Sequence, residues 1–144
     1  MNIQSILARK GSQVVTIRAR QSIREALEAL AQYNIGALVV VNHAEQPIGI
    51  LSERDIVRAA ANGESIFHLN VHALMTRELI TGIPDDDLEV VAHTMTEKRI
   101  RHVPVVDQGQ LVGIVSIGDI VKAQRDQYEG ELYTLQTQLL ADTA

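Results

Sequence analysis

Two short stretches decide the fold: Gly49-Ile50-Leu51-Ser52-Glu53-Arg54-Asp55-Ile56-Val57 and Gly113-Ile114-Val115-Ser116-Ile117-Gly118-Asp119-Ile120-Val121. They lie 64 residues apart and share a glycine, two apolar residues, a serine and, three residues later, an aspartate. The apolar residues before each serine are typical of a strand, and the serine and aspartate are typical of a helix N-terminus. The chain therefore contains one strand-to-helix junction twice.

The repetition extends outward from these junctions. At an offset of 65 residues, Val15-Thr16-Ile17 aligns with Ile80-Thr81-Gly82, and the apolar run 38–41 aligns with 103–106. Between these segments, both copies carry apolar residues at the spacing of one helical face: Ile23, Ala26 and Leu30, then Leu88, Val91 and Met95. One residue is missing from the second copy, within the polar segment that precedes each glycine stretch. Two copies of one unit of about 60 residues are present.

Each copy predicts the element order β-α-β-β-α. First strands are expected at 14–17 and 79–81, and hairpins at 37–41 with 48–51 and at 103–106 with 111–115. The first helices follow Ser22 and the run Asp85-Asp86-Asp87 as N-cap candidates, and second helices are expected at 53–61 and from 117 onward. One unit can bury only one face of its sheet, so the two should pack together with pseudo-two-fold symmetry. The expected fold class is α/β (α+β), with an additional C-terminal helix.

The expected organisation is an N-terminal segment at 1–12, repeats at 13–62 and 76–125, a linker at 63–75 and a helical tail at 126–144. Apolar residues continue at helical spacing along this tail: Val121, Tyr128, Leu132, Leu135 and Leu139. Arg125 interrupts the stripe, and Gly130 weakens the helix by about 1 kcal/mol relative to alanine. We expect the tail to support a homodimer; docking on its own repeats is the alternative.

Composition excludes several classes of function. The formal net charge of −5 argues against general nucleic-acid binding, which needs a broad basic surface. With no cysteine, the chain has no disulfide, thiol nucleophile or Cys-ligated metal. No apolar run is long enough to cross a membrane, and the N-terminus lacks the pattern of a signal peptide, so we expect a cytoplasmic protein. Only 3% of the residues are aromatic, which predicts an aliphatic core.

The duplicated Gly-x-x-Ser-x-x-Asp pattern resembles the signature of cystathionine-β-synthase-type (CBS) domains. Ala73-Leu74-Met75-Thr76 and Arg101-His102-Val103-Pro104-Val105-Val106-Asp107 are similar to two further features of that family. The resemblance covers about residues 13–125 and implies a CBS pair, also called a Bateman module. It implies a regulatory module rather than an enzyme, with no required cofactor. Such pairs bind AMP, ADP, ATP, sometimes NAD(H) or S-adenosylmethionine, and signal to a partner protein.

The resemblance also implies two clefts between the repeats, in which the aspartate binds the ribose. Residues carried over to the first cleft are Ile50, Ser52, Arg54, Asp55, Thr81, Arg101, His102, Val103 and Pro104. Residues carried over to the second are Thr16, Ile17, Ala37, Leu38, Ile114, Ser116 and Asp119. The second has Gly36-Ala37 in place of Arg101-His102 and Gly118 in place of Arg54, so we expect the first to favour phosphorylated ligands. Lys98 and Arg99 are expected at a solvated helix end.

Simpler interpretations stand beside these. Asp55, Asp119 and the two serines could be plain helix caps. His68 and His72 lie four residues apart but lack a third ligand nearby, so no metal site is predicted. Ser116, His102 and Asp119 are the residue types of a hydrolase triad, but no nucleophile elbow accompanies them. The alternative functions are an interaction module with clefts that do not bind, and a small nucleotide-processing hydrolase.

Overall fold

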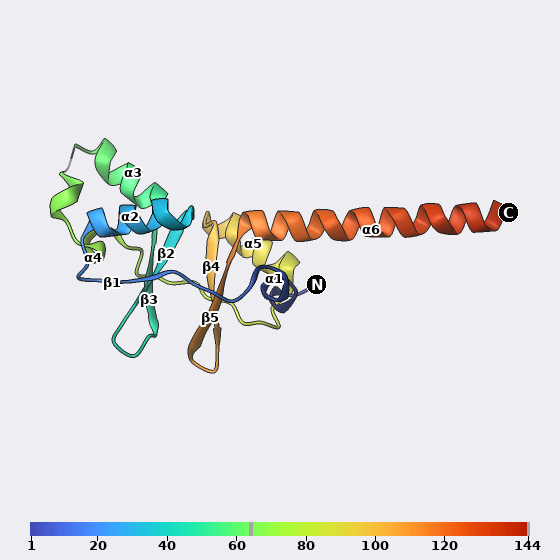
Figure 1. Cartoon of the computed structure of the whole chain (residues 1–144), viewed down its shortest axis with the longest axis horizontal. Coiled ribbons are helices and arrows are strands. Elements are labelled where there is room, and N and C mark those ends of the chain that lie inside the picture. The colour runs from blue at the N-terminus through green and yellow to red at the C-terminus, as the bar shows by residue number, and fades with distance from the viewer. Residues whose placement is uncertain (64, 144) are drawn as a thin grey trace.

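The computed structural model describes residues 1–63 and 65–143 (Figure 1). The first repeat contains β1 (Thr16–Arg18), α2 (Ile23–Tyr33), β2 (Ala37–Val41), β3 (Pro47–Ser52) and α3 (Glu53–Ala61). The second contains α5 (Leu88–Lys98), β4 (His102–Asp107), β5 (Gln110–Ser116) and α6 (Ile117–Thr143). Three short helices lie outside these runs: α1 (Ile3–Lys10), η1 (Ile66–His68) and α4 (Val71–Leu74). Mixed α/β architecture in two repeats is confirmed.

The first repeat forms the expected three-stranded sheet. β1 pairs with β2 in parallel, and β2 pairs with β3 as an antiparallel hairpin. All five residues of β2 are buried because this strand lies at the centre of the sheet. Ser22 caps α2 by accepting a hydrogen bond from the N–H of Glu25, as its sequence position predicted.

The second sheet has two strands instead of three, so the strand expected at 79–81 was wrong. Only Gly82 pairs with the sheet: its N–H donates to the carbonyl of Pro104 (2.9 Å), and its carbonyl accepts from the N–H of Val106 (2.8 Å). The pairing stops there because the next N–H, that of Ile83, bonds to the Asp86 carboxylate. Pro84 follows and has no N–H to donate.

The N-terminal segment forms a helix that completes the core of the second repeat. Ile3, Ile6 and Leu7 of α1 are buried in the same cluster as residues of α5, β4, β5 and α6. α4 does the equivalent for the first repeat, where Val71 is fully buried. Each repeat is therefore closed by the helical segment that precedes the other repeat in the chain.

The core is aliphatic, as the composition predicted. The buried hydrophobic residues of the described chain are Ile, Leu, Val, Ala and Met, and most of them lie in two clusters, one for each repeat. The four aromatic residues, Tyr33, Phe67, Tyr128 and Tyr133, are all exposed. In Figure 1 the two hairpins lie beside each other, with α2, α3 and α4 around the first and α1 and α5 near the second.

The second helix of the second repeat and the tail form one continuous helix, α6. Ile120 and Ala123 are buried, whereas every described residue from Gln127 onward is exposed. Figure 1 shows this part projecting as an arm beyond the two repeats. Docking of the tail on its own repeats, the alternative left by the sequence, is therefore wrong. Among the described residues, no helix combines the length and apolar character that a membrane span requires.

Candidate functional site

The signature serines and aspartates form two matching helix caps. Ser52 Oγ accepts a hydrogen bond from the N–H of Asp55 (3.2 Å), and Asp55 Oδ2 accepts one from the N–H of Ser52 (3.0 Å). Ser116 and Asp119 repeat these bonds at 3.1 and 2.9 Å. The capping role is thus present in both repeats. In the described part of the chain, no hydrogen bond involves Oδ1 of either aspartate, which leaves one acceptor free for a ligand.

The signature glycines make room for the neighbouring helical segments. A Cβ at Gly113 would lie 2.6 Å from Leu7 Cδ2, and a Cβ at Gly49 would lie 2.9 Å from Met75 Sδ and 3.0 Å from the carbonyl of Thr76. Real Cβ atoms do not approach other atoms this closely. The glycines therefore serve the packing of α1 and of the segment after α4, which is a structural reason for a motif that also borders the clefts.

The first hollow between the repeats has a volume of about 550 Å³. It brings together six of the residues predicted for the first cleft: Ile50, Ser52, Arg54, Asp55, Arg101 and His102. The rest of its lining is Gly36, Glu53, Val57, Arg58, Thr76, Arg99 and Ile100. Residues 36–58 come from the first repeat and 99–102 from the second, so the hollow spans the boundary between the two.

Four arginines outnumber the two carboxylates, Glu53 and Asp55, in the lining of this first cleft: Arg54, Arg58, Arg99 and Arg101. In the described chain, none of them takes part in an ion pair. An adjoining hollow of about 450 Å³ shares Arg54, Arg99 and Arg101. Guanidinium groups without acidic partners suit phosphate oxygens. Over the residues described, no three His, Asp or Glu side chains gather in a way that could hold a metal ion.

Sequence reasoning did not assign two of these arginines to the cleft. Arg99 lies exposed at the end of α5, as expected, but in the left-handed conformation (φ 55°), and it also lines the cleft. Arg58 lies four residues after Arg54 in α3, on the same helical face. That spacing was the signal that could have identified Arg58.

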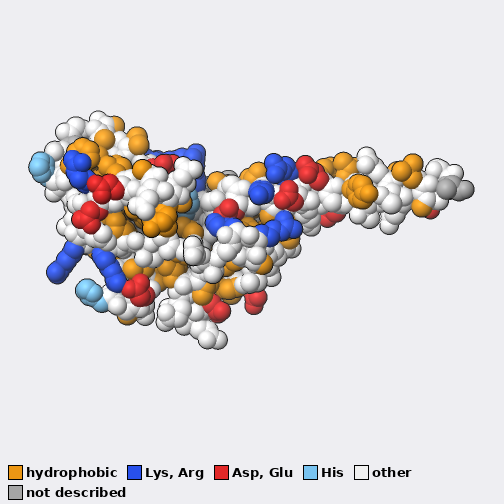
Figure 2. All heavy atoms as spheres, viewed as in Figure 1, with side chains coloured by type: hydrophobic (Ala, Val, Ile, Leu, Met, Phe, Trp, Pro, Cys, Tyr) orange, Lys and Arg blue, Asp and Glu red, His pale blue; other side chains and the backbone are white. Residues whose placement is uncertain are grey.

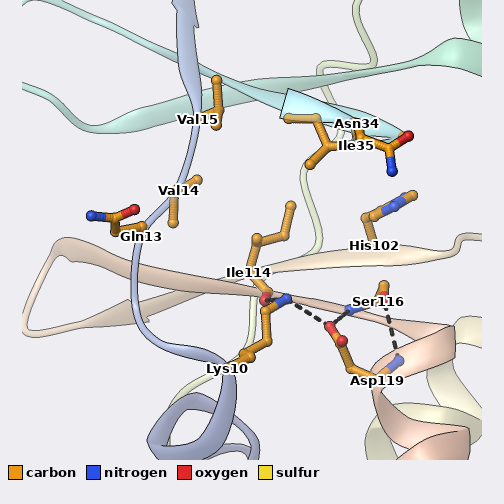
Figure 3. A pocket seen from close by; sticks show the side chains of 12 residues that line it. Lys10, Gln13, Val14, Val15, Asn34, Ile35, His102, Ile114, Ser116 and Asp119 are labelled. Atoms are coloured by element: carbon orange, nitrogen blue, oxygen red, sulfur yellow. Dashed lines mark hydrogen bonds and ion pairs between the residues drawn. The ribbon is translucent and has the colours of Figure 1, made fainter. Parts of the chain in front are cut away.

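The second hollow has a volume of about 390 Å³ and is shown in Figure 3. It brings together four of the residues predicted for the second cleft: Ala37, Ile114, Ser116 and Asp119. The rest of its lining is Lys10, Gln13, Val14, Val15, Asn34, Ile35, Gly36 and His102. The approach to β1 and the end of α1 form one wall, which the repeat alignment did not predict.

Lys10 places a cation in the second cleft, where the sequence predicted none. Its Nζ donates to Asp119 Oδ2 (2.7 Å) and to the carbonyl of Ile114 (3.0 Å), as Figure 3 shows for the aspartate. Burial by itself would raise the pKa of the Asp119 carboxyl. The hydrogen bonds and charge of Lys10, together with the hydrogen bonds from Ser116, outweigh burial and lower that pKa. Asp119 is thus ionised and already paired.

His102 lines both clefts and lies between them. A Cβ on Gly36 would lie 3.4 Å from its Cε1, so the imidazole packs against the backbone of the first repeat. Burial is the main cause that lowers the pKa of His102. Glu53 and Asp119 raise that pKa and Lys10 and Arg101 lower it, with a net shift downward, so His102 is neutral at pH 7.

Six predicted site residues do not line either hollow: Thr16, Ile17, Leu38, Thr81, Val103 and Pro104. Ile17, Leu38 and Val103 point into the cores, because alternate residues of a strand face opposite sides. Pro104 is buried beside the bridge to Gly82, and Thr81 and Thr16 are exposed outside the hollows. The structure therefore does not bring these six side chains to either hollow.

A signal for the missed helix α1 is present in the sequence. Asn2-Ile3-Gln4-Ser5-Ile6-Leu7 matches Asn70-Val71-His72-Ala73-Leu74-Met75 in pattern. In both segments the asparagine side chain caps the helix, and the next residue donates its N–H to the opposite repeat: Ile3 to Asp86 (3.0 Å) and Val71 to Gln21 (2.8 Å). In this alignment Lys10 corresponds to Glu78, so the segment equivalent to α1 carries an acidic residue where α1 carries the lysine of the second cleft.

Comparison with known proteins gives one family. The profile of the CBS domain matches residues 6–62 and 71–126. The mitochondrial CBS domain-containing protein CBSX3 of Arabidopsis thaliana is 39% identical over 119 residues, which cover 79% of this chain and 58% of that protein. This chain thus spans little more than half the length of that relative.

Solved structures share the fold over most of this chain. The CBS-domain containing protein ATU1752 from Agrobacterium tumefaciens has a TM-score of 0.82 and 38% identity, and the match covers 86% of this chain and 99% of that one. The CBS domain pair of protein MJ0100, solved in complex with 5′-methylthioadenosine and S-adenosyl-L-methionine, has a TM-score of 0.79 and 30% identity, over 88% and 98% of the two chains. Two profile matches, one on each structural repeat, show that the chain belongs to the CBS-domain family, as a tandem pair of CBS domains.

Proposed function

We propose that the chain is a regulatory module, not a catalyst, that binds an adenosine-containing nucleotide in the first cleft. The observation that carries this proposal is the combination of the Asp55 carboxylate with four arginines that have no acidic partner among the described residues. A ribose and its phosphates carry the complementary groups: two hydroxyl donors and several anionic oxygens. The cleft volume of about 550 Å³ is in the range of small-molecule sites.

Asp55 is the proposed ribose ligand. Its Oδ2 is fixed by the N–H of Ser52 (3.0 Å), which orients the carboxylate and leaves Oδ1 for a sugar hydroxyl. A hydrogen bond to an ionised acceptor is stronger than one between neutral groups. Ile50 would contact the base, and Ser52 and His102 border the same hollow.

The arginines are the proposed phosphate ligands and point to AMP, ADP, ATP or NAD(H). MJ0100 was solved with two adenosine compounds that carry no phosphate, which supports recognition of the adenosine part in this family. The phosphate preference therefore rests on Arg54, Arg58, Arg99 and Arg101 of this chain. Such a preference would suit an energy-sensing role in signal transduction.

The second cleft is the weaker candidate for a nucleotide site. Lys10 bonds to Asp119 Oδ2 and to the carbonyl of Ile114, so its ammonium group already lies beside the carboxylate that a nucleoside would meet there. In the first cleft the carbonyl of Ile50 instead accepts the N–H of Thr76 (2.8 Å), and among the described residues no cation pairs with Asp55. We propose that the second cleft binds adenosine ligands more weakly than the first.

We further propose that the module acts as a homodimer and passes ligand occupancy to a separate protein. A ligand shifts a conformational equilibrium only if it binds the two conformations unequally. The clefts lie between the repeats, so a ligand there can favour one arrangement of the repeats over another. Two-fold dimers are the most common oligomers, and a dimer would present the ligand-dependent arrangement of the repeats on both subunits.

Titration calorimetry with adenosine, AMP, ATP, NAD and S-adenosylmethionine tests the proposal. The variant Asp55→Asn keeps a side-chain acceptor for the cap, and its matched control is Asp119→Asn in the other repeat. We expect Asp55→Asn to lose roughly 10- to 100-fold in AMP affinity, because it removes an ionised acceptor. Asp119→Asn should leave the tighter site unchanged.

The phosphate part is tested separately with Arg101→Gln. This variant should weaken AMP and ATP while leaving adenosine affinity within about twofold, since the lost contact is to phosphate. Equal AMP affinity in the original chain and Asp55→Asn would refute the ribose assignment. Turnover of any of these nucleotides on prolonged incubation would favour the hydrolase alternative.

A further inference from the structure

The projecting part of α6 has the surface of a helix that needs a partner. From Gln127 to Thr143 every residue is exposed, and the apolar residues Tyr128, Leu132, Leu135 and Leu139 are between 47% and 70% exposed. Figure 2 shows hydrophobic side chains on the surface of the arm. A lone helix of this length, with Gly130 inside it, is marginal in water.

The apolar residues follow a heptad pattern. Val121, Arg125, Tyr128, Leu132, Leu135, Leu139 and Asp142 occur at alternating intervals of four and three residues, which are the a and d positions of a coiled coil. The two charged members lie at the ends of the four-residue apolar segment. Arg125 lies where α6 leaves the repeats, and Asp142 lies near the tip.

The charges of Arg125 and Asp142 favour one register for a pair of α6 helices. If two copies of α6 run antiparallel about a point midway between Leu132 and Leu135, Leu132 meets Leu135 and Tyr128 meets Leu139 of the second copy. In the same register Arg125 meets Asp142, at both ends of the pair. A parallel pair in register would instead place arginine against arginine and aspartate against aspartate. Shifting the antiparallel pair by one heptad puts a charged residue opposite a leucine.

We propose that α6 pairs with α6 of a second copy of this chain as an antiparallel coiled coil in that register. The contact closes on itself by two-fold symmetry, so it makes a dimer and not a filament. The flanking positions agree with it, because Glu129 and Glu131 lie at the level of Gln138 and Gln136 of the second copy rather than against like charges. The inference rests on the proposed homodimer but does not depend on nucleotide binding.

Disulfide trapping tests the register, because the chain has no cysteine of its own. Two variants, Tyr128→Cys and Leu139→Cys, are prepared with tags of different size, mixed and oxidised. We expect the mixed disulfide between the two variants to dominate, with little cross-linking of either variant alone. A disulfide needs Cα atoms within about 7 Å, whereas two copies of residue 128 in the antiparallel pair are about 16 Å apart along the axis. Cross-linking of each variant with itself would overturn the proposal in favour of a parallel pair.

Charge exchange tests the contact without any cross-link. Arg125→Asp and Asp142→Arg should each weaken the dimer by about tenfold in sedimentation experiments, because each places like charges together twice. The double variant Arg125→Asp/Asp142→Arg should restore the affinity of the original chain. Failure of the double variant to restore it would overturn the antiparallel register while leaving the homodimer intact. A chain that is monomeric at high concentration would overturn both, and nucleotide titration would still decide the first-cleft proposal.

Discussion

At the scale of single residues, Lys10 distinguishes Asp119 from Asp55, although the two aspartates have equivalent positions in the repeats. Both cap a helix through the same pair of hydrogen bonds, but Asp119 also accepts a hydrogen bond from the ammonium group of Lys10 (2.7 Å), which has no counterpart at Asp55 within residues 1–63 and 65–143. Side-chain exposures of 34% and 25% make this a partly solvated ion pair, which contributes little to stability. Its consequence is competition: a sugar hydroxyl that approaches Asp119 meets a carboxylate that already has a cationic partner.

Replacing Lys10 should therefore open the second cleft. In an Asp55→Asn background, which weakens the first cleft, we expect Lys10→Met to raise the adenosine affinity of the second by about two- to fivefold, the worth of a partly exposed ion pair. Methionine keeps the apolar part of the side chain and removes the charge. Calorimetry provides the measurement, with Lys98→Met, an exposed lysine in the last turn of α5, as the matched control. A loss of adenosine affinity in Lys10→Met would mean that this lysine helps to bind the ligand.

Sequence reasoning reached the capping residues but not the cation beside them. Ser52 with Asp55 and Ser116 with Asp119 were predictable because a cap depends on residues three apart in the chain. Lys10 contacts a residue 109 positions away, and no local pattern encodes that distance. Arg101 was predicted for the cleft from the resemblance, whereas its neighbour Arg99 depends on a left-handed backbone that the sequence does not display.

At the scale of elements, α1 packs closely on β5 because the residue of β5 at the contact is a glycine. Gly113 lies under Leu7, which is 6% exposed, and a Cβ there would come within 2.6 Å of Leu7 Cδ2. Because a leucine can shift only by disturbing its own packing, the fit couples the two positions. The equivalent contact in the first repeat, Gly49 with Met75, also involves the carbonyl of Thr76.

A double-mutant cycle tests this coupling. Gly113→Ala should destabilise the fold by about 1–3 kcal/mol through overpacking, and Leu7→Ala by about 2–5 kcal/mol through the cavity it leaves. In the double variant the new methyl group enters that cavity, so the combined loss should be smaller than the sum by at least about 1 kcal/mol. Urea unfolding gives the values, and Gly118→Ala, whose Cβ would lie 3.6 Å from Ser116 Oγ, is the control without a clash. Additive losses in the free energy of unfolding would show that positions 7 and 113 are not energetically coupled.

The elements themselves were predictable where a local pattern specifies them. Short apolar runs separated by polar turns predicted both hairpins, and helical spacing predicted α2 and α5. The strand expected at 79–81 failed because its pairing ends at Gly82, where Asp86 takes the next N–H. The N-terminal helix was missed because its partner is the second repeat, and only the match between segments 2–7 and 70–75 reveals it.

At the scale of the whole molecule, the two repeats keep separate cores and meet around His102. Its ring lies beside Gly36 of the first repeat and lines both clefts. The charged groups near it are Glu53, Lys10, Asp119 and Arg101, two of each sign, so their effects on the imidazole oppose each other. Burial therefore determines the direction in which its pKa is shifted, and protonation would place a charge between the repeats.

This arrangement makes stability depend on pH with a definite sign. Because the pKa of His102 is lowered from 6.5 in the folded state, the unfolded chain binds more protons once the pH falls below that value. The stability that His102 contributes is therefore present above pH 6.5 and decreases as the pH falls toward the folded pKa. Asp119 acts in the same direction, but only as the pH falls through its own lowered pKa, below 3.8.

Urea unfolding at about pH 7.5 and about pH 5.5 separates the contribution of His102 from that of Asp119. His102→Gln should reduce the loss of stability between these values, whereas His43→Gln, on an exposed turn, should not. An equal loss in the original chain and His102→Gln would show that the residue between the clefts is not the group that titrates.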